Sequence, residues 1–409
     1  MTANRILLAD ADAFYVAVAR MVDPEGAGKA RLLIVGGSRE SRGVVCSASY
    51  ETRKYGVRSA MPISRALRLC PEATCVPVPR KACSTKSREI RSTLERFAPI
   101  VEGASIDEWY LDMGGTEGVY HDEPLATTAQ RMREAVRSDT GLTISVGGGT
   151  NKLVAKMAVE RAKPKPGSSA DGVFIVPPGQ EAEFLRTFTL AEVPLIGPKF
   201  QERLAALGMT NVPDVLQYNL PTLEAWLGKR EGEWLWDRVH GVDRSSVDPG
   251  GEAKSISRDE TFPHDISDDR ELERELLALV TRAAFDLRSE GLAARTITVR
   301  IRDMDFRTRS ARRTLVEPVV SDRVLMRVAR ELLMKLRLAR RVPARLLGVA
   351  LSSLGQDPEA DQLKLFEAVS NTDVDTDRDR VLARAVDRVR AKFGRNSIGP
   401  ASLAEDETG

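Results

Sequence analysis

The sequence predicts a multidomain fold of mixed α/β class. Its 409 residues exceed the length that a single hydrophobic core usually supports. Short apolar, β-compatible runs alternate with helix-compatible stretches over about the first 178 residues. A segment rich in Asp, Ser, Pro and Gly at residues 243–254 then separates a helical region from a second set of strands and helices. We therefore expect several domains.

Strands and helices can be placed in order along the first part. Arg5–Ala9 is typical of a central strand, and a helix is expected to begin at Ala13. Leu142–Val146 is a β-rich run, and we expect Gly147–Gly149 after it to form a plain tight turn, although such a turn before a helix can also cradle phosphate. Further strands are expected at residues 31–36 and 173–176, and further helices at residues 80–97, 123–140 and 151–162.

Composition excludes several classes of protein. Hydrophobic residues make up 42% and charged residues 29%, as in soluble globular proteins, and no stretch of about 18 apolar residues predicts a membrane span. The four cysteines lack Cys-x-x-Cys spacing and only three histidines accompany them, which argues against a zinc site and favours free thiols in the cytoplasm.

The net charge of +2 conceals an uneven distribution. Residues 254–353 contain 21 Lys and Arg against 15 Asp and Glu, whereas the residues after 353 contain 8 against 12. A basic segment followed by an acidic tail favours a polyanionic partner for residues 254–353.

Acidic residues stand at the ends of two predicted strands. Asp10 follows the first apolar run, and Asp107 and Glu108 precede another. If these strands pair, the three carboxylates converge, and grouped carboxylates suit Mg²⁺. Because adjacent residues of a strand point to opposite faces, we expect residues 104–107 to form a hairpin turn. For an isolated Asp-Glu pair, a solvated acidic turn is the more common explanation.

Four segments together resemble the Y-family DNA polymerases, the error-tolerant enzymes of translesion synthesis. Ser105–Glu108 resembles the catalytic motif of that family and Asp10–Tyr15 its first metal motif. Tyr50–Val57 resembles the fingers motif, and Asn151–Ala158 with Ala162–Pro164 matches a fourth segment. The similarity runs in order from about residue 5 to residue 353, and it is strongest to the bacterial DNA polymerase IV branch.

This resemblance implies a right-hand polymerase with palm, small fingers, helical thumb and a C-terminal little finger. The expected domains are palm 1–13 and 80–178, fingers 14–79, thumb 179–244, linker 245–254, little finger 255–353 and an acidic tail 354–409. The function implied is template-directed addition of dNTPs to a primer 3′ end, with low fidelity and bypass of damaged bases. The partners implied are primer–template DNA, a dNTP and the bacterial sliding clamp. We expect a monomer that does not attach to a membrane.

The resemblance also implies roles for individual residues. Asp10, Asp107 and Glu108 would be catalytic and, with the backbone carbonyl of Ala11, would hold two Mg²⁺ ions. Tyr50, Arg53 and Lys163 would bind the triphosphate. Tyr15 would exclude the ribose 2′-hydroxyl, whereas Phe14 is better explained as a core aromatic. Ala11 and Ala13 are smaller than the residues usual in this motif.

Two segments are candidates for DNA contact. Pro194–Lys199 resembles the hairpin of a helix-hairpin-helix, which implies phosphate contacts at Ile196, Gly197 and Lys199, although Leu195 stands where that motif usually has glycine. Thr296–Arg302 alternates, so that Ile297, Val299 and Ile301 share one face. Helices at residues 269–288 and 321–338 should cover this apolar face.

Seven arginines between residues 295 and 313 accompany this strand. We expect their face to contact the DNA backbone, through Arg300, Arg302 and Arg307. An exposed face that needs only solubility is the alternative.

The tail contains a candidate partner motif. Gln362, Leu363, Leu365 and Phe366 resemble the peptide by which bacterial polymerases bind the sliding clamp, the alternative being a helical turn that packs on the little finger. Two rival functions are a catalytically idle DNA-binding scaffold, which the intact acids disfavour, and a palm-fold nucleotide cyclase, which would need no thumb or basic C-terminal domain.

Overall fold

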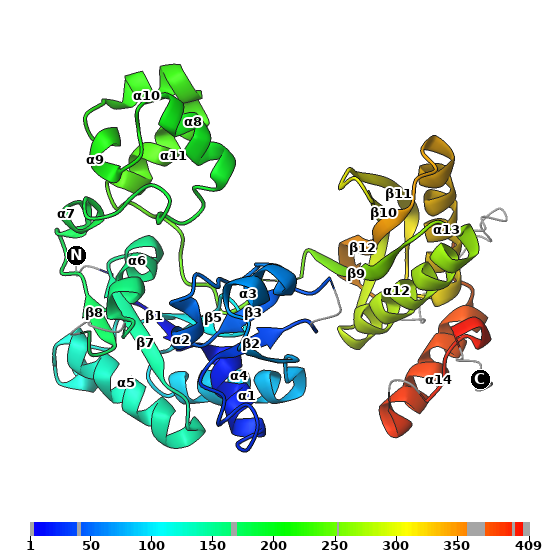
Figure 1. Cartoon of the computed structure of the whole chain (residues 1–409), viewed down its shortest axis with the longest axis horizontal. Helices are drawn as coiled ribbons and strands as arrows, with labels where there is room; N and C mark the ends of the chain where they lie inside the picture. Colours follow the sequence, from blue (N-terminus) through cyan, green and yellow to red (C-terminus); the bar gives the residue numbers. More distant parts are fainter. Residues whose placement is uncertain are drawn as a thin grey trace, which may run out of the picture. The chain divides into compact units, whose positions relative to one another are not determined.

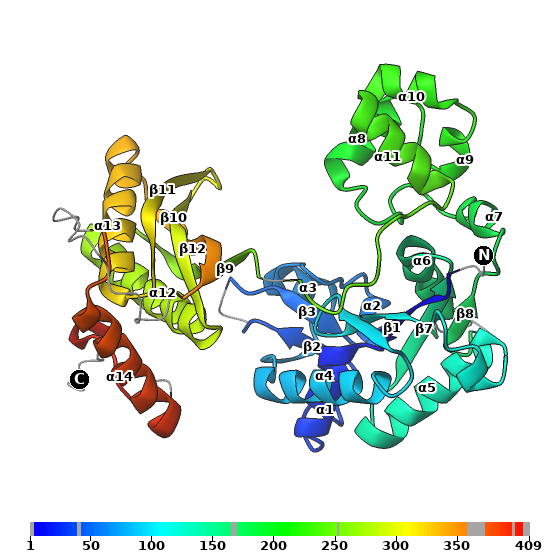
Figure 2. The same ribbon diagram turned by 180° about the vertical axis from the view of Figure 1, so that it is seen from behind.

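The structure, a computed structural model, describes residues 4–38, 42–164, 170–251, 253–357, 373–394 and 397–403. The chain divides into two compact units, Met1–Gly251 and Glu252–Gly409. Figures 1 and 2 show them from opposite sides. No helix within the described ranges is long and apolar enough to cross a membrane.

A five-stranded sheet forms the centre of the first unit. Its strands are β1 (Ile6–Ala11), β5 (Ile100–Gly103), β6 (Glu108–Asp112), β7 (Ile144–Gly149) and β8 (Val173–Ile175). They lie in the order β5-β6-β1-β7-β8, so that β1 is central and pairs antiparallel with both β6 and β7. All six residues of β1 are buried, which confirms the predicted central strand.

Helices cover both faces of this sheet (Figure 1). They are α1 (Phe14–Val22), α4 (Arg80–Leu94), α5 (Leu125–Thr140) and α6 (Lys152–Ala162), with a short 3₁₀ helix η1 (Gly118–Tyr120). Alternate residues of a strand point to opposite faces. Leu7 and Ala9 therefore pack with α1, α4 and α5, whereas Ile6 and Leu8 pack with α6. By the same alternation Asp10 points to the α6 face.

The three glycines after Val146 do not form the predicted turn. Gly147–Gly149 continue β7 and pair with β1, where Gly149 lies opposite Ile6. A Cβ atom on Gly147 would lie 2.1 Å from the backbone nitrogen of Val159 in α6. The glycines therefore allow α6 to pack directly on the strand. Their role is to permit this close packing and not to reverse the chain.

A smaller sheet lies in the region predicted as fingers. Its strands β2 (Leu33–Gly36), β3 (Val45–Ala48) and β4 (Thr74–Val76) are accompanied by helices α2 (Tyr50–Arg53) and α3 (Ile63–Leu69). The order is β3-β2-β4, with Ile34 and Ile63 in the core. Ser49 caps α2, because its hydroxyl accepts a hydrogen bond from the Thr52 N–H.

Five helices occupy the region predicted as thumb. They are α7 (Glu181–Leu185), α8 (Pro198–Ala206), α9 (Val212–Val215), α10 (Leu220–Leu227) and α11 (Lys229–Val239). Their core includes Leu204, Leu223 and Leu235, and it also receives Leu153 and Met157 from α6. One helix of the region predicted as palm thus contributes to the core of the region predicted as thumb.

The second unit contains a four-stranded antiparallel sheet under two long helices. Its elements are β9 (Ser255–Ile266), α12 (Asp269–Ser289), β10 (Leu292–Asp303), β11 (Thr308–Val319), α13 (Asp322–Ala339) and β12 (Ala344–Gln356). The strand order is β11-β10-β12-β9. Ile297, Val299 and Ile301 are fully buried with residues of α12 and α13, which confirms the predicted alternation and both helices.

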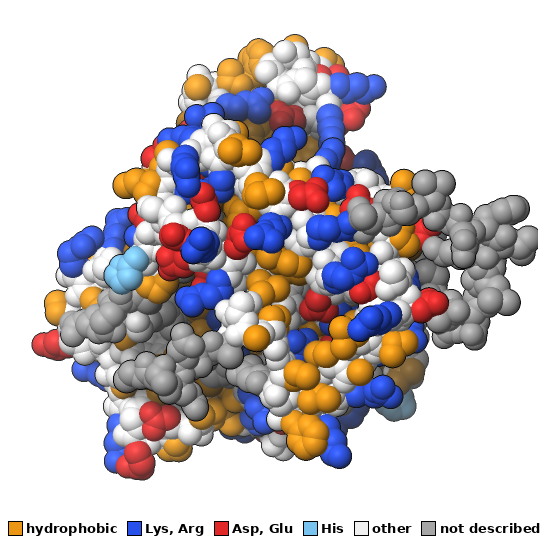
Figure 3. Space-filling model, turned by 90° about the vertical axis from the view of Figure 1, so that its right-hand side faces the viewer, with side chains coloured by type: hydrophobic (Ala, Val, Ile, Leu, Met, Phe, Trp, Pro, Cys, Tyr) orange, Lys and Arg blue, Asp and Glu red, His pale blue; other side chains and the backbone are white. Residues whose placement is uncertain are grey.

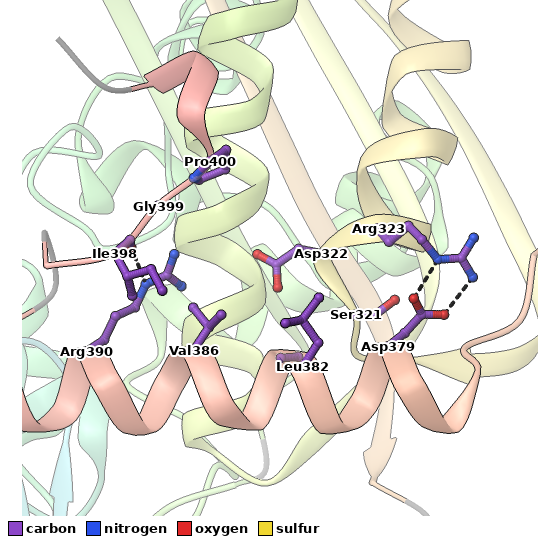
Figure 4. Close-up of a pocket in the computed structure, with 11 residues that line it drawn as sticks. Ser321, Asp322, Arg323, Asp379, Leu382, Val386, Arg390, Ile398, Gly399 and Pro400 are labelled. Atoms are coloured by element: carbon purple, nitrogen blue, oxygen red, sulfur yellow. Dashed lines mark hydrogen bonds and ion pairs between the residues drawn. The ribbon is translucent and has the colours of Figure 1, made fainter.

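The acidic tail contributes a further helix to this unit. α14 (Asp377–Phe393) precedes a 3₁₀ turn η2 (Ala401–Leu403). Arg288 of α12 donates to Asp387 over 2.6 Å. Arg323 of α13 donates to Asp379 over 2.7 Å, the pair that Figure 4 shows. Leu382 and Ile398 line a cavity of about 250 Å³ beside the pair of Arg323 and Asp379. On the face that Figure 3 shows, basic and acidic side chains are interspersed.

Candidate active site

Strand pairing brings the first and last of the three predicted acids together. Asp10 on β1 lies directly opposite Glu108 on β6. Both side chains lie on the sheet face that α6 covers, and each affects the pKa of the other. Asp10 is buried and Glu108 is half-buried. Residues that are about 100 positions apart in the sequence thus form one acidic pair.

Asp107 belongs to the predicted hairpin turn, which is confirmed. Residues 104–107 form a bend, and the N–H of Ala104 donates to the Glu108 carbonyl over 2.9 Å. The Asp107 carbonyl accepts from the N–H of Ala11 over 2.9 Å, which fixes the turn against β1. The Asp107 carboxylate accepts a hydrogen bond from the Ser105 hydroxyl over 2.6 Å. The third acid is therefore adjacent to the pair, but its carboxylate is held by Ser105.

Two lysines from α6 and its C-terminal end compensate the acidic pair. Lys156 forms an ion pair with Glu108, and the Lys163 Nζ lies 2.9 Å from Asp10. Burial raises the pKa of Asp10 to about 7, with Lys163 opposing this and Glu108 adding to it. Burial also acts to raise the pKa of Glu108, but the hydrogen bond and charge of Lys156 outweigh it and hold that pKa below its ordinary value.

The donor set of this site suits a hard divalent cation. Asp10, Asp107 and Glu108 offer carboxylate oxygens, the ligand type that Mg²⁺ prefers. The raised pKa of Asp10 shows that buried negative charge is incompletely compensated by the lysines. Among the described residues, however, no three Asp, Glu, His or Cys side chains already gather as a metal cage. Binding would therefore require the Asp107 side chain to turn from Ser105 toward the pair.

The predicted nucleotide-binding residue Tyr50 is electrostatically coupled to the acid site. Tyr50 and Arg53 lie on α2, where the Arg53 guanidinium is 4.9 Å from the centre of the Tyr50 ring. The pKa of Tyr50 is raised by burial and by the charge of Asp12, while Arg53 and Lys163 act in the opposite direction. These electrostatic contacts place α2 of the fingers region beside the acid site.

Phe14 and Tyr15 differ in their surroundings, as expected. Phe14 is 2% exposed and packs in the core beside the five-stranded sheet, whereas Tyr15 is half-buried. Burial and the charge of Asp107 raise the pKa of Tyr15, so its hydroxyl lies near the acid turn. The position of Tyr15 is compatible with the predicted gate.

Sequence reasoning missed two contacts at the candidate site. Lys156 is one, and its only signal was the seven-residue spacing to Lys163 along one helix face. Asp12 is the other: its carboxylate accepts from the buried Ser145 hydroxyl over 2.7 Å. This bond anchors the turn in which Ala13 adopts a φ of 45°, directly before Phe14.

The predicted thumb hairpin precedes α8. Gly197 is the N-cap residue of α8 and Lys199 is exposed, but Ile196 is buried in the thumb core. Ile196 can therefore meet a phosphate only through its backbone. Leu195 is 78% exposed with a φ of 71°, the conformation that glycine usually supplies at this point.

The arginines of β10 and β11 do not all share one face. Arg300 and Arg302 alternate with the buried core residues of β10, and Arg307 is exposed in the turn. Arg309 instead binds Asp303, and Arg313 binds Glu331 of α13. The prediction of seven outward arginines is thus wrong for Arg309 and Arg313. The candidate clamp residues Gln362, Leu363, Leu365 and Phe366 lie outside the described residues.

Three families of known proteins match successive parts of the chain. The impB/mucB/samB family matches residues 9–160, and the impB/mucB/samB family C-terminal domain matches residues 253–365. Residues 191–243 match the family described as DNA polymerase-iota, thumb domain. The three matches follow one another along the chain, and the thumb-domain match lies within the region predicted as thumb.

Relatives match over nearly the whole chain. DNA polymerase IV of Treponema denticola is 34% identical over 400 residues, which are 97% of this chain and 96% of the relative. DNA polymerase IV of Desulfatibacillum aliphaticivorans is 35% identical over 406 residues, which are 99% of this chain and 98% of the relative.

Solved structures give the same result. A Y-family DNA polymerase chimera matches with a TM-score of 0.75 and 25% identity, over 86% of this chain and 100% of the chimera. An insertion ternary complex of Dbh DNA polymerase matches with a TM-score of 0.59 and 26% identity, over 85% of this chain and 98% of that one. The chain therefore belongs to the Y family of DNA polymerases and is an enzyme of the DNA polymerase IV type.

Proposed function

We propose that this DNA polymerase adds dNTPs to a primer 3′ end by two-metal catalysis with Mg²⁺, at low fidelity and past damaged template bases. The observation that carries the proposal is the pairing of Asp10 with Glu108 across β1 and β6, with Asp107 in the adjoining turn. Two Mg²⁺ ions bound there would supply activation of the primer hydroxyl and stabilisation of the leaving oxygen.

The residues of the chain have separate tasks in this proposal. Asp10, Asp107, Glu108 and the carbonyl of Ala11 would hold the ions. Tyr50 and Arg53 supply a phenol donor and a guanidinium fork, which together suit a triphosphate. Lys163, whose Nζ lies 2.9 Å from an Asp10 oxygen, would exchange this partner for the triphosphate.

The small fingers support the proposed low fidelity. After α1, the described residues of this region form three short strands and two short helices, of which α2 has 4 residues and α3 has 7. Little protein is thus available to enclose the nascent base pair, so discrimination by shape should be weak. The ternary complex among the structural relatives supports DNA and nucleotide as substrates.

Primer extension tests the proposal. A primer annealed to a template is incubated with Mg²⁺ and single dNTPs, first on an undamaged template and then opposite an abasic site. We expect addition directed by the template base, frequent misinsertion and extension past the lesion. DNA binding without extension would favour the idle scaffold, and nucleotide turnover without a primer would favour a cyclase.

Replacing Tyr15 by alanine should admit ribonucleotides. The ring blocks the 2′-hydroxyl by contact, so its removal should lower the ratio of dNTP to rNTP catalytic efficiency by at least about tenfold, equivalent to roughly 1.4 kcal/mol of discrimination. Tyr15→Phe keeps the ring and is the matched control. An unchanged ratio in Tyr15→Ala would show that Tyr15 is a packing residue.

We also propose that Gln362, Leu363, Leu365 and Phe366 bind the sliding clamp, on the strength of their sequence alone. Tethering would raise the effective concentration of the enzyme on DNA without new DNA contacts. The double variant Leu365→Ala with Phe366→Ala should keep clamp-free extension and lose its stimulation by a loaded clamp. Comparing extension with and without clamp measures this, and persistent stimulation would contradict the assignment.

A further inference from the structure

Helix α6 places lysines over the carboxylates of the sheet face that it covers. The pairs are Lys152 with Glu102, Lys156 with Glu108 and Lys163 with Asp10. The spacing of four residues keeps Lys152 and Lys156 on one side of the helix, and Lys163 directly follows the last residue of α6. All three carboxylates belong to neighbouring strands, β5, β6 and β1.

Two of these lysines have evident roles. Lys152 Nζ lies 2.7 Å from both Glu102 oxygens and 4.7 Å from the centre of the Tyr110 ring, away from the acid pair. Lys163 also contacts Glu160 over 2.6 Å and is the proposed triphosphate ligand. Lys156 remains to be explained, and its ion pair is with a proposed metal ligand.

The position of Lys156 differs from that of an ordinary surface ion pair. Its side chain is 27% exposed and that of Glu108 is 24% exposed, so solvent screens their attraction only in part. Glu108 also faces Asp10 across the strand pair, where two carboxylates would repel each other. A cation at this point therefore offsets the repulsion and limits the orientations of the Glu108 carboxylate.

We propose that Lys156 is a positioning residue that holds Glu108 beside Asp10 and competes with the divalent cation for this carboxylate. The inference rests on the proposed metal site. Its consequence is that the enzyme without nucleotide keeps a stable acid pair but binds divalent cations weakly. Firm binding would follow the arrival of the triphosphate, whose negative charge exceeds the single positive charge of Lys156.

Mn²⁺ binding to the full-length chain without DNA or dNTP tests the inference, with free Mn²⁺ followed by electron paramagnetic resonance. Lys156→Met should bind Mn²⁺ about tenfold more tightly, because a unit positive charge a few ångströms away has been removed. Lys156→Gln, a second neutral variant, should change in the same direction. Lys156→Arg keeps the charge and should stay within about twofold of the wild type.

Lys152→Met is the matched control. It also removes one ion-paired lysine from α6, but at a carboxylate outside the acid pair, so its Mn²⁺ affinity should stay within about twofold of the wild type. Thermal unfolding in EDTA gives an independent readout. Lys156→Met should melt at a lower temperature than the wild type, and saturating Mn²⁺ should narrow this difference, because a ligand that binds the folded state stabilises it.

Unchanged or weakened Mn²⁺ affinity in both neutral Lys156 variants would overturn the inference. Glu108→Ala distinguishes this failure from failure of the proposed function. If Glu108→Ala loses Mn²⁺ binding while Lys156→Met matches the wild type, the metal site is correct and only the role of Lys156 is wrong. If Glu108→Ala binds Mn²⁺ like the wild type, both the metal assignment and the role of Lys156 fail.

Discussion

Replacing Glu108 or Asp107 by alanine should reduce nucleotide addition by about 10³-fold or more, since one lost metal ligand removes several kcal/mol of transition-state stabilisation. Affinity for primer–template DNA should change little, because the proposed DNA contacts lie on the thumb hairpin and on β10. Single-turnover extension measures the first quantity, and binding of a fluorescent primer–template measures the second.

Glu102→Ala is the control for these variants. Glu102 lies on β5 and pairs with a lysine of α6, as Glu108 does, but it is not part of the acidic pair. Its loss should leave the rate of addition close to that of the wild type. Normal extension by both Asp107→Ala and Glu108→Ala would remove the support for a metal site at these residues.

Local patterns were sufficient to predict the backbone around the site. The β1 strand was recognisable from a continuous apolar run, and the turn at residues 104–107 followed from the need to present two adjacent acids at one place. In β10, the alternation of Ile297, Val299 and Ile301 predicted both the buried face and the helices over it, and the structure confirms each of these features.

Features that depend on a distant partner were not predictable in this way. Three consecutive glycines are usual in turns, and only the close approach of α6 explains their place in β7. Lys156 reads as an ordinary helix surface residue until β6 delivers Glu108 beside it. The sequence does not distinguish Arg309 and Arg313 from arginines that point outward, because the acidic residues that bind them belong to other segments.

The α14 helix is another element that the sequence predicts poorly. Hydrophobic periodicity gives a weak signal there, since the helix buries Ala383 and Arg390 and leaves Val381 and Leu382 exposed. Its attachment depends on charge pairs such as Arg288 with Asp387 and Arg323 with Asp379. Such ion pairs depend on how two segments lie against each other in the fold. The hydrophobic periodicity of one segment does not predict them.

Replacing Asp303 by alanine should destabilise the second unit by about 3–5 kcal/mol, the usual effect of removing one partner from a buried ion pair. Asp303 ends β10, is 0% exposed, and accepts from Arg309 over 2.9 Å. It also pairs with Arg340, which follows α13. Its loss would leave two guanidinium groups without their shared carboxylate at the junction of the β10–β11 hairpin and α13.

The effect of Asp303→Ala should be confined to one unit, which the tryptophans allow to be checked. All four tryptophans, Trp109, Trp226, Trp234 and Trp236, lie in the first unit, so their fluorescence during urea unfolding reports that unit alone. Hydrogen exchange of β10, β11 and α13 in the full chain reports the second unit.

Asp305→Ala is the control, because Asp305 binds the same Arg340 over 2.7 Å but its side chain is 48% exposed, where an ion pair contributes little. We expect faster exchange in Asp303→Ala with an unchanged fluorescence midpoint and near wild-type behaviour in Asp305→Ala. Equal effects of the two variants would show that Asp303 acts as a surface charge and not as the buried centre of this junction.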